Sequence, residues 1–156
     1  MRLRLLWVIC LPAFLTLPAC ERRSAALGRA TSIEANMNSL RQVPGRLKEP
    51  SGEESPFTAY FQQMDLQMVE ELPKPGEDLR KRYYYVEGKL FSFRQFRDRT
   101  TEKQFHIDRK GEVRPVKPVP FPTEESNQVA LRAEALKGAA MERAGHMFVF
   151  PLMRNR

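Results

Sequence analysis

The sequence predicts an α+β fold: a small antiparallel β-meander of about four strands, with an N-terminal helix before it and a C-terminal packing helix after it. Short runs rich in aromatic and β-branched residues lie between positions 64 and 114, and turn residues separate them. Segments 21–42 and 123–144 flank these runs. Both place apolar residues every three to four positions, which is typical of amphipathic helices.

The first helix is expected over residues 21–42. Val43-Pro44-Gly45 follows it, and proline and glycine are strong helix terminators. Such a helix either packs on its own domain or serves as a spacer or short coiled-coil contact near a membrane. The apolar positions that form its stripe are Leu27, Ala30, Ile33, Met37 and Leu40.

Residues 44–56 are rich in proline, glycine, serine and charge, and they lack apolar periodicity. This composition predicts a flexible linker, because such a segment buries too little surface to offset its ordering entropy. The next segment, 57–72, fits two patterns. Its aromatic residues fit a helical stripe, whereas residues 64–70 alternate as in a strand, and we favour a strand for this second half.

The clearest β-hairpin lies between residues 80 and 97. Two aromatic runs flank Glu87-Gly88, and a two-residue loop that ends in glycine suits a hairpin turn. If Val86 pairs with Lys89, regular pairing places Arg82 opposite Phe93, so that Arg82 and Arg94 fall on opposite faces. The other expected pairs are Tyr84 with Phe91, Tyr85 with Leu90 and Tyr83 with Ser92.

A second hairpin is expected over residues 103–114, with Asp108 and Gly111 at the ends of its turn. Alternate prolines then occupy residues 115–122. They favour an extended polyproline strap that leads to the last helix, or a docking strip for a partner.

The last helix is expected over residues 123–144, with Thr123 as its N-cap and Gly145 as its stop. The apolar segment 147–153 follows. We interpret it as a final edge strand or core plug, or as a strand that binds a partner.

The chain begins with a basic Met-Arg-Leu-Arg stretch and an apolar run of about thirteen residues, which ends in Leu17-Pro18-Ala19-Cys20. This pattern is typical of a cleaved secretory signal over residues 1–19, since a membrane-spanning helix needs roughly twenty apolar residues. Leu17, Ala19 and Cys20 resemble the lipobox of bacterial lipoprotein precursors. The alternative is an ordinary secretory signal that contains Cys20.

The resemblance to lipoprotein precursors implies that Cys20 is lipidated and becomes the first residue of the mature chain. Two or more acyl chains give a stable membrane anchor. In that family, aspartate directly after the cysteine favours retention in the inner membrane. Here the residue after Cys20 is Glu21, so the resemblance implies the outer membrane, with the domain facing the periplasm. The expected organisation is then a signal peptide (1–19), a membrane-proximal helix (20–43), a linker (44–56) and an α+β domain (57–156).

Charge and cysteine content narrow the classes of function. The chain has 26 basic and 19 acidic residues; removal of residues 1–19 removes Arg2 and Arg4 and leaves a net charge of +5. On this interpretation Cys10 would be lost with the leader and Cys20 would be blocked by lipid, so no thiol would remain for a disulfide, a thiolate metal cluster or thiol catalysis. We do not expect nucleic acid as a partner, because the leader exports the chain.

The sequence contains no recognisable catalytic constellation. His106 and His146 are its two histidines, and neither lies in a spacing typical of a metal site. Nucleophile-elbow, phosphate-loop and dinucleotide motifs are also missing from it. We therefore expect no enzyme activity, no cofactor and no metal.

A basic region marks the expected sheet. It is either a solvated rim or a surface that binds an envelope protein. The leading hypothesis is a lipid-anchored binding or envelope-assembly module; the alternative is an inhibitor or immunity protein that blocks an envelope-degrading enzyme. The candidate partner-binding residues are Arg80, Lys81, Arg82, Arg94, Arg97, Arg109 and Lys110, with Arg99 and Arg114 in the same region.

Overall fold

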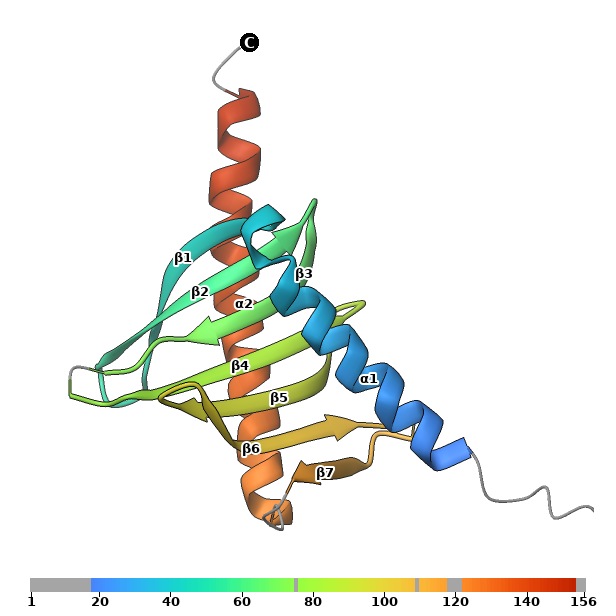
Figure 1. The fold of residues 1–156 in the computed structure, drawn as a ribbon. Coiled ribbons are helices and arrows are strands. Elements are labelled where there is room, and N and C mark those ends of the chain that lie inside the picture. The colour runs from blue at the N-terminus through green and yellow to red at the C-terminus, as the bar shows by residue number, and fades with distance from the viewer. Residues whose placement is uncertain (1–17, 75, 109, 118–121, 154–156) are drawn as a thin grey trace, which may run out of the picture.

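The structure, a computed structural model, describes residues 18–74, 76–108, 110–117 and 122–153 (Figure 1). A seven-stranded antiparallel sheet forms a meander in which each strand pairs with the next along the chain. This confirms the α+β class and the meander, but the expectation of about four strands is wrong. The strands are β1 (Arg41–Lys48), β2 (Glu54–Gln62), β3 (Asp65–Glu71), β4 (Leu79–Val86), β5 (Lys89–Arg97), β6 (Thr100–Ile107) and β7 (Val113–Lys117).

Two helices lie on opposite faces of the sheet (Figure 1). The long helix α2 (Thr123–Met153) crosses one face, and α1 (Pro18–Ala35) lies on the other, followed by the short 3-10 helix η1 (Met37–Ser39). Both helices were predicted at these ends of the domain. In the described part of the chain no helix is both long and apolar enough to span a membrane.

The main hydrophobic core lies between α2 and the sheet. Leu136 on α2 is fully buried, and Tyr85 donates a hydrogen bond of 2.7 Å from its hydroxyl to the backbone oxygen of Ala133. Burial of a leucine or phenylalanine side chain contributes roughly 1.5–3 kcal/mol, so this layer dominates stability. Its buried members are Val43, Phe57, Ala59, Phe61, Leu66, Val69, Tyr83, Tyr85, Phe93, Phe105, Ala133, Leu136, Ala140 and Ala144.

An ionic cluster also ties α2 to the sheet. The Arg132 guanidinium lies 2.6 Å from Glu49 and 2.6 Å from Glu71, and Tyr83 donates a hydrogen bond of 3.0 Å to Glu71. Burial opposes the charge on Arg132, but hydrogen bonds with the two carboxylates outweigh it and raise the arginine pKa. The cluster therefore joins α2 both to β3 and to the turn between β1 and β2.

A smaller apolar cluster lies under α1, on the other face. Its buried members, Ala30, Ile33, Tyr60, Met68 and Tyr84, come from the helix and from β2, β3 and β4. α1 passes over only part of this face, and the ends of the strands nearer the β3–β4 loop are left uncovered (Figure 1).

The predicted linker at 44–56 is wrong, because most of it belongs to β1 and β2. Val43 points into the core and Leu47 packs against it, a short alternation that proline and glycine obscure in the sequence. A tight turn joins the strands: Gly52 donates its backbone N–H to Glu49 at 2.9 Å. The first helix ends at Ala35, well before the expected position 42, because the chain from Arg41 onward belongs to β1.

Both edge strands contain a proline, Pro44 in β1 and Pro115 in β7. Proline is tolerated at a sheet edge because its missing N–H can face away from the ladder, and it discourages another strand from adding there. The predicted polyproline strap at 115–122 is therefore wrong for its first residues, which pair within β7. Residues 118–121 of the predicted strap lie outside the described residues.

The ambiguous segment 57–72 forms two strands, so the helical alternative is wrong and the strand favoured for its second half is confirmed as β3. β2 and β3 pair through a turn at Gln63, whose φ of 57° is left-handed. The second predicted hairpin is also confirmed as β6 and β7. Asp108 accepts backbone hydrogen bonds at its turn from Lys110 and Glu112.

The end of α2 differs from the prediction. Gly145 was expected to stop the helix and residues 147–153 to form a strand, but the helix continues to Met153. Ala140 and Ala144 are buried one helical turn apart, so the helix still packs on the sheet directly before the glycine. The side chains from residue 148 onward lie outside the described part of the chain.

Candidate binding face

A β-bulge in the β4–β5 hairpin determines which arginines share a face. Val86 pairs with Lys89 and Tyr85 with Leu90, as predicted, but the register then shifts by one residue. Arg82 consequently pairs with Arg94, on the same face, and the prediction that these two arginines lie on opposite faces is wrong. The expected pairs of Tyr84 with Phe91, Arg82 with Phe93 and Tyr83 with Ser92 are wrong for the same reason; Tyr84 pairs with Ser92 and Tyr83 with Phe93.

The shifted register builds a polar row across four strands on the α1 face. Glu70 pairs with Arg82, Arg82 with Arg94, and Arg94 with Gln104. The row lies beside the apolar cluster under α1, since residues two apart on a strand share a face. One carboxylate, two neighbouring guanidiniums and one amide therefore follow one another where a sheet face would otherwise be apolar.

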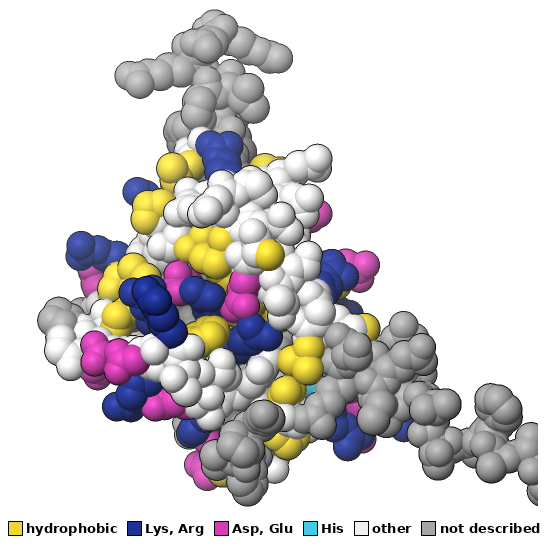
Figure 2. Space-filling view, viewed as in Figure 1, with side chains coloured by type: hydrophobic (Ala, Val, Ile, Leu, Met, Phe, Trp, Pro, Cys, Tyr) yellow, Lys and Arg dark blue, Asp and Glu magenta, His cyan; other side chains and the backbone are white. Residues whose placement is uncertain are grey.

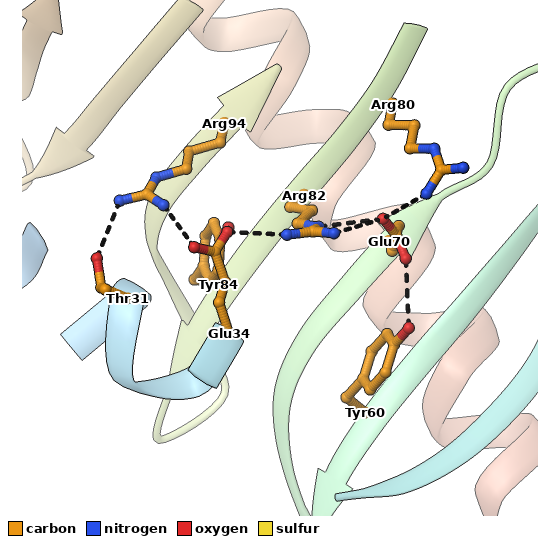
Figure 3. A network of polar contacts seen from close by, with 8 residues as sticks. All are labelled: Thr31, Glu34, Tyr60, Glu70, Arg80, Arg82, Tyr84 and Arg94. Atoms are coloured by element: carbon orange, nitrogen blue, oxygen red, sulfur yellow. Dashed lines mark hydrogen bonds and ion pairs between the residues drawn. The ribbon is translucent and has the colours of Figure 1, made fainter. Parts of the chain in front are cut away.

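The last turn of α1 contributes Glu34 to this row (Figure 3). Its carboxylate accepts hydrogen bonds from Arg82 at 3.0 Å, from Arg94 at 2.6 Å and from the hydroxyl of Tyr84. Arg94 also donates to Thr31 at 3.4 Å. The bonds to Glu34 are charge-assisted, which makes them stronger than neutral ones, and their groups are partly buried, so they hold the end of α1 on the sheet.

Glu70 is the second carboxylate of the network and is almost fully buried (Figure 3). Arg82 binds it through two nitrogens at 3.1 and 3.0 Å, and Tyr60 donates a hydroxyl hydrogen bond at 3.2 Å. Burial and then the neighbouring Glu70 charge raise the pKa of Tyr60 to about 12. Burial opposes the charge of Arg82, but Glu70 and Glu34 together raise its pKa.

Arg80 is the outermost member of the network. Its guanidinium lies 4.0 Å from Glu70, beyond hydrogen-bond distance, and 57% of its side chain is exposed. Arg82 and Arg94 each hold a carboxylate at 3.0 Å or closer. Three guanidiniums face two carboxylates, which leaves one positive charge in excess, and Arg80 is the group most available to another molecule.

A pocket of about 550 Å³ opens beside Arg80, between the β3–β4 loop and the β5–β6 turn. Phe96 pairs with Arg80 in the sheet, and the guanidinium carbon of Arg82 lies 4.9 Å from the centre of the Phe96 ring. Such a cation–π contact holds both groups in place. The pocket is lined by Pro73, Asp78, Arg80, Arg82, Phe96, Asp98 and Arg99.

The β5–β6 turn at the rim of this pocket is strained. Asp98 and Arg99 both have left-handed backbone angles, with φ of 46° and 72°. The Glu87-Gly88 turn has the same pattern of angles but uses glycine where φ is 72°. A left-handed arginine costs about 1–2 kcal/mol relative to its ordinary conformation, and strain of this kind often accompanies a functional site.

The structure brings together three of the predicted binding residues, Arg80, Arg82 and Arg94. Lys81 and Arg97 alternate with them and point toward the α2 face, where Arg97 bonds to Glu102 at 2.7 Å. Lys110 lies in the β6–β7 turn at the other end of the sheet, and Arg109 lies outside the described residues.

The site also includes Glu34, Glu70 and Phe96, which sequence reasoning missed. Their isolated positions show nothing unusual in the sequence; the bulge and the docking of α1 bring them together. Cys20 lies in the first turns of α1, but its side chain is outside the part of the chain that the structure describes. Residues 1–17 of the predicted leader also lie outside the described residues.

Within the described residues, no group of three or more His, Cys, Asp or Glu side chains is placed to hold a metal ion. Comparison of the chain with protein-family models, with curated proteins and with solved structures finds no match. The site is therefore interpreted from its own geometry and chemistry.

Proposed function

We propose that this chain is a lipid-anchored protein of the outer membrane that faces the periplasm, and that its domain is a non-catalytic binding or envelope-assembly module. The observation that carries the binding role is the part of the sheet that α1 leaves uncovered. Basic, acidic and apolar side chains lie together on this face of the molecule (Figure 2). All three kinds of side chain also line the pocket at Arg80. The lipobox-like Leu17-Pro18-Ala19-Cys20 supports the anchor.

The helix α1 would couple the anchor closely to the domain. Cys20 precedes Ala30, which is fully buried against the sheet, by ten positions within one helix. At a helical rise of 1.5 Å per residue this separation is about 15 Å. Acyl chains on Cys20 would thus hold the sheet near the bilayer through a helix, and not through the flexible linker that the sequence suggested.

The proposed anchor also sets where the pocket faces. The N-terminal end of α1 and the pocket's two loops, β3–β4 and β5–β6, lie at opposite ends of the sheet (Figure 1). A bilayer at the start of α1 would leave the pocket directed away from it, toward the periplasmic space. This orientation favours a periplasmic partner over a lipid of the anchoring membrane.

Replacement of the lipidated cysteine tests the anchor. We expect Cys20→Ser to move the protein from the membrane fraction to the soluble envelope fraction, and the lipid-modified peptide to disappear from mass spectra. Cys10→Ser, within the predicted leader, is the matched control and should stay in the membrane fraction. An unmodified Cys20 thiol in the native protein would contradict the proposal.

An assay of cell-wall hydrolysis, with and without the purified protein, separates the binding module from an inhibitor of an envelope-degrading enzyme. The binding module predicts no change in hydrolysis. If the purified protein inhibits hydrolysis and Arg80→Gln abolishes this inhibition, the protein is an inhibitor of an envelope-degrading enzyme and the binding-module proposal is wrong.

A further inference from the structure

The pocket beside Arg80 holds charges of both signs that are not neutralised by one another. Asp78, Asp98 and Arg99 are exposed and form no ion pair with another residue that the structure describes. Arg80 has Glu70 as its nearest carboxylate, at 4.0 Å. Three arginines and two aspartates thus line one cavity. Arg99, Asp78 and Asp98 have no ion-pair partner among the described residues, and Arg80 has only the long contact with Glu70, so these four groups are available to a ligand.

The inner wall of the pocket is rigid and partly apolar. Arg82 is fixed by Glu34 and Glu70 and stacks over Phe96, so it is already satisfied and acts as a wall. Pro73, on the β3–β4 loop, also lines the pocket. The half-buried Phe96 ring lines the same pocket and offers an apolar surface on which an aliphatic stem could lie.

We propose that this pocket binds a short zwitterionic peptide, one that presents a carboxylate and an ammonium group on either side of an aliphatic stem. Arg80 and Arg99 bind the carboxylate, because guanidinium groups donate two hydrogen bonds in the geometry that a carboxylate accepts. Asp78 and Asp98 bind the ammonium. The inference rests on the proposed function and names the chemistry of its ligand.

The strained turn supports this assignment. Arg99 keeps a φ of 72° at a position where glycine would relieve the strain, as Gly88 does at the corresponding place in the β4–β5 turn. Arg99 lines the pocket, and its guanidinium has no hydrogen-bond or ion-pair partner among the described residues. The arginine therefore contributes a charge at the rim at the expense of local stability.

Titration of the full chain, purified in a nonionic detergent, with acetyl-Lys-Ala tests the proposal. This probe has a side-chain ammonium and a C-terminal carboxylate. NMR should show shifts of the Asp98 and Arg99 backbone amides and of the Arg80 guanidinium. Acetyl-Lys-Ala-amide, without the carboxylate, and acetyl-norleucyl-Ala, without the ammonium, should each bind about fivefold more weakly or worse.

Matched variants separate the pocket from general charge. Arg80→Gln and Asp78→Asn should each weaken binding about fivefold, whereas Arg97→Gln, an equally exposed arginine on the other face, should leave it unchanged. Equal binding of the three peptides, or no shift with any of them, would overturn the proposal. Tighter binding of glycerophosphoethanolamine would also overturn it in favour of a lipid headgroup. These results do not depend on the state of Cys20, so the anchor and the ligand are tested separately.

Discussion

Glu34 on α1 and Arg94 on β5 are 60 positions apart in the sequence, yet their charged groups lie 2.6 Å apart. Glu34 also binds Arg82 and Tyr84, so one carboxylate joins α1 to both strands of the β4–β5 hairpin. The apolar contact under α1 is small, with Ala30 and Ile33 as its buried members from the helix. The docking of α1 therefore depends strongly on Glu34.

Glu34→Gln should release the C-terminal turn of α1 and destabilise the fold by about 2–4 kcal/mol, because two partly buried guanidiniums lose a carboxylate. Chemical denaturation measures the loss, and hydrogen exchange should increase within α1. Glu54→Gln is the control: its ion pair with Arg46 is exposed, and its loss should change stability by less than about 1 kcal/mol. Equal effects of the two substitutions would contradict a docking role for Glu34.

The turns of the sheet could be predicted from the sequence, but the shared face of Arg82 and Arg94 could not. Glu87-Gly88 is a local pattern that requires a left-handed glycine, and this requirement is visible in two residues. A β-bulge has no such local pattern here. It inserts Phe91 into a run in which every residue suits a strand, and one extra residue reverses the faces of all that follow.

The first two strands were hidden for a different reason. β1 is an edge strand, so Pro44 and Gly45 are acceptable there although they resemble a linker in composition. Gly45 has a packing role that becomes visible only in three dimensions. A β-carbon built on it would lie 2.3 Å from the ring of Phe57.

Gly45→Ala should therefore destabilise the protein by about 1–3 kcal/mol, because the fully buried Phe57 ring must move to make room for a methyl group. Gly138→Ala serves as the control, since Gly138 is at an exposed position of α2 and nothing lies within 4 Å of the added methyl group. This substitution should stabilise the helix by up to about 1 kcal/mol. Urea denaturation compares the two variants. A neutral Gly45→Ala would show that Phe57 does not pack on this backbone.

Arg99→Gly should raise stability by about 1 kcal/mol, because it relieves the left-handed strain in the β5–β6 turn. The same substitution should weaken binding of the zwitterionic peptide about fivefold, since it removes a guanidinium from the pocket. Thermal denaturation and NMR titration give the two readouts. A variant that gains stability and keeps full binding would remove Arg99 from the proposed site.

Leu136→Ala should cost about 2–5 kcal/mol, because this side chain is fully buried between α2 and the sheet and leaves a cavity. Leu131 is on the same helix but is 73% exposed, and Leu131→Ala should change stability by less than about 0.5 kcal/mol. Chemical denaturation of both variants measures the two losses of stability and so checks which side of α2 packs on the sheet. Similar losses would contradict the packing described for this helix.

The four tyrosines should make the protein sensitive to alkali. Burial, aided by Glu70 for Tyr60, raises the pKa of Tyr60 from 10.0 to about 12, and burial raises the pKa values of Tyr83, Tyr84 and Tyr85 as well. Between pH 10 and pH 12 the unfolded chain loses these protons while the folded chain keeps them. The free energy of unfolding is therefore fully retained below pH 10 and falls as the pH rises above it.

Spectrophotometric titration checks this prediction. Phenolate absorbance should stay low in the native protein at pH 10.5 and should develop with an ordinary pKa in concentrated urea. Tyr60→Phe should remove the earliest native transition. A native titration centred at pH 10 would contradict the burial of these hydroxyl groups.

Site-specific photo-crosslinking in living cells tests the central claim most directly, namely that the pocket at Arg80 is the binding site of an envelope-anchored module. A photoreactive amino acid is placed at position 77, an exposed site on the β3–β4 loop next to the pocket residue Asp78, or at position 110, at the other end of the sheet. We predict one specific adduct from position 77, which Arg80→Gln reduces strongly, and none from position 110. The same adduct from both positions, or an adduct that Arg80→Gln leaves unchanged, would contradict this account.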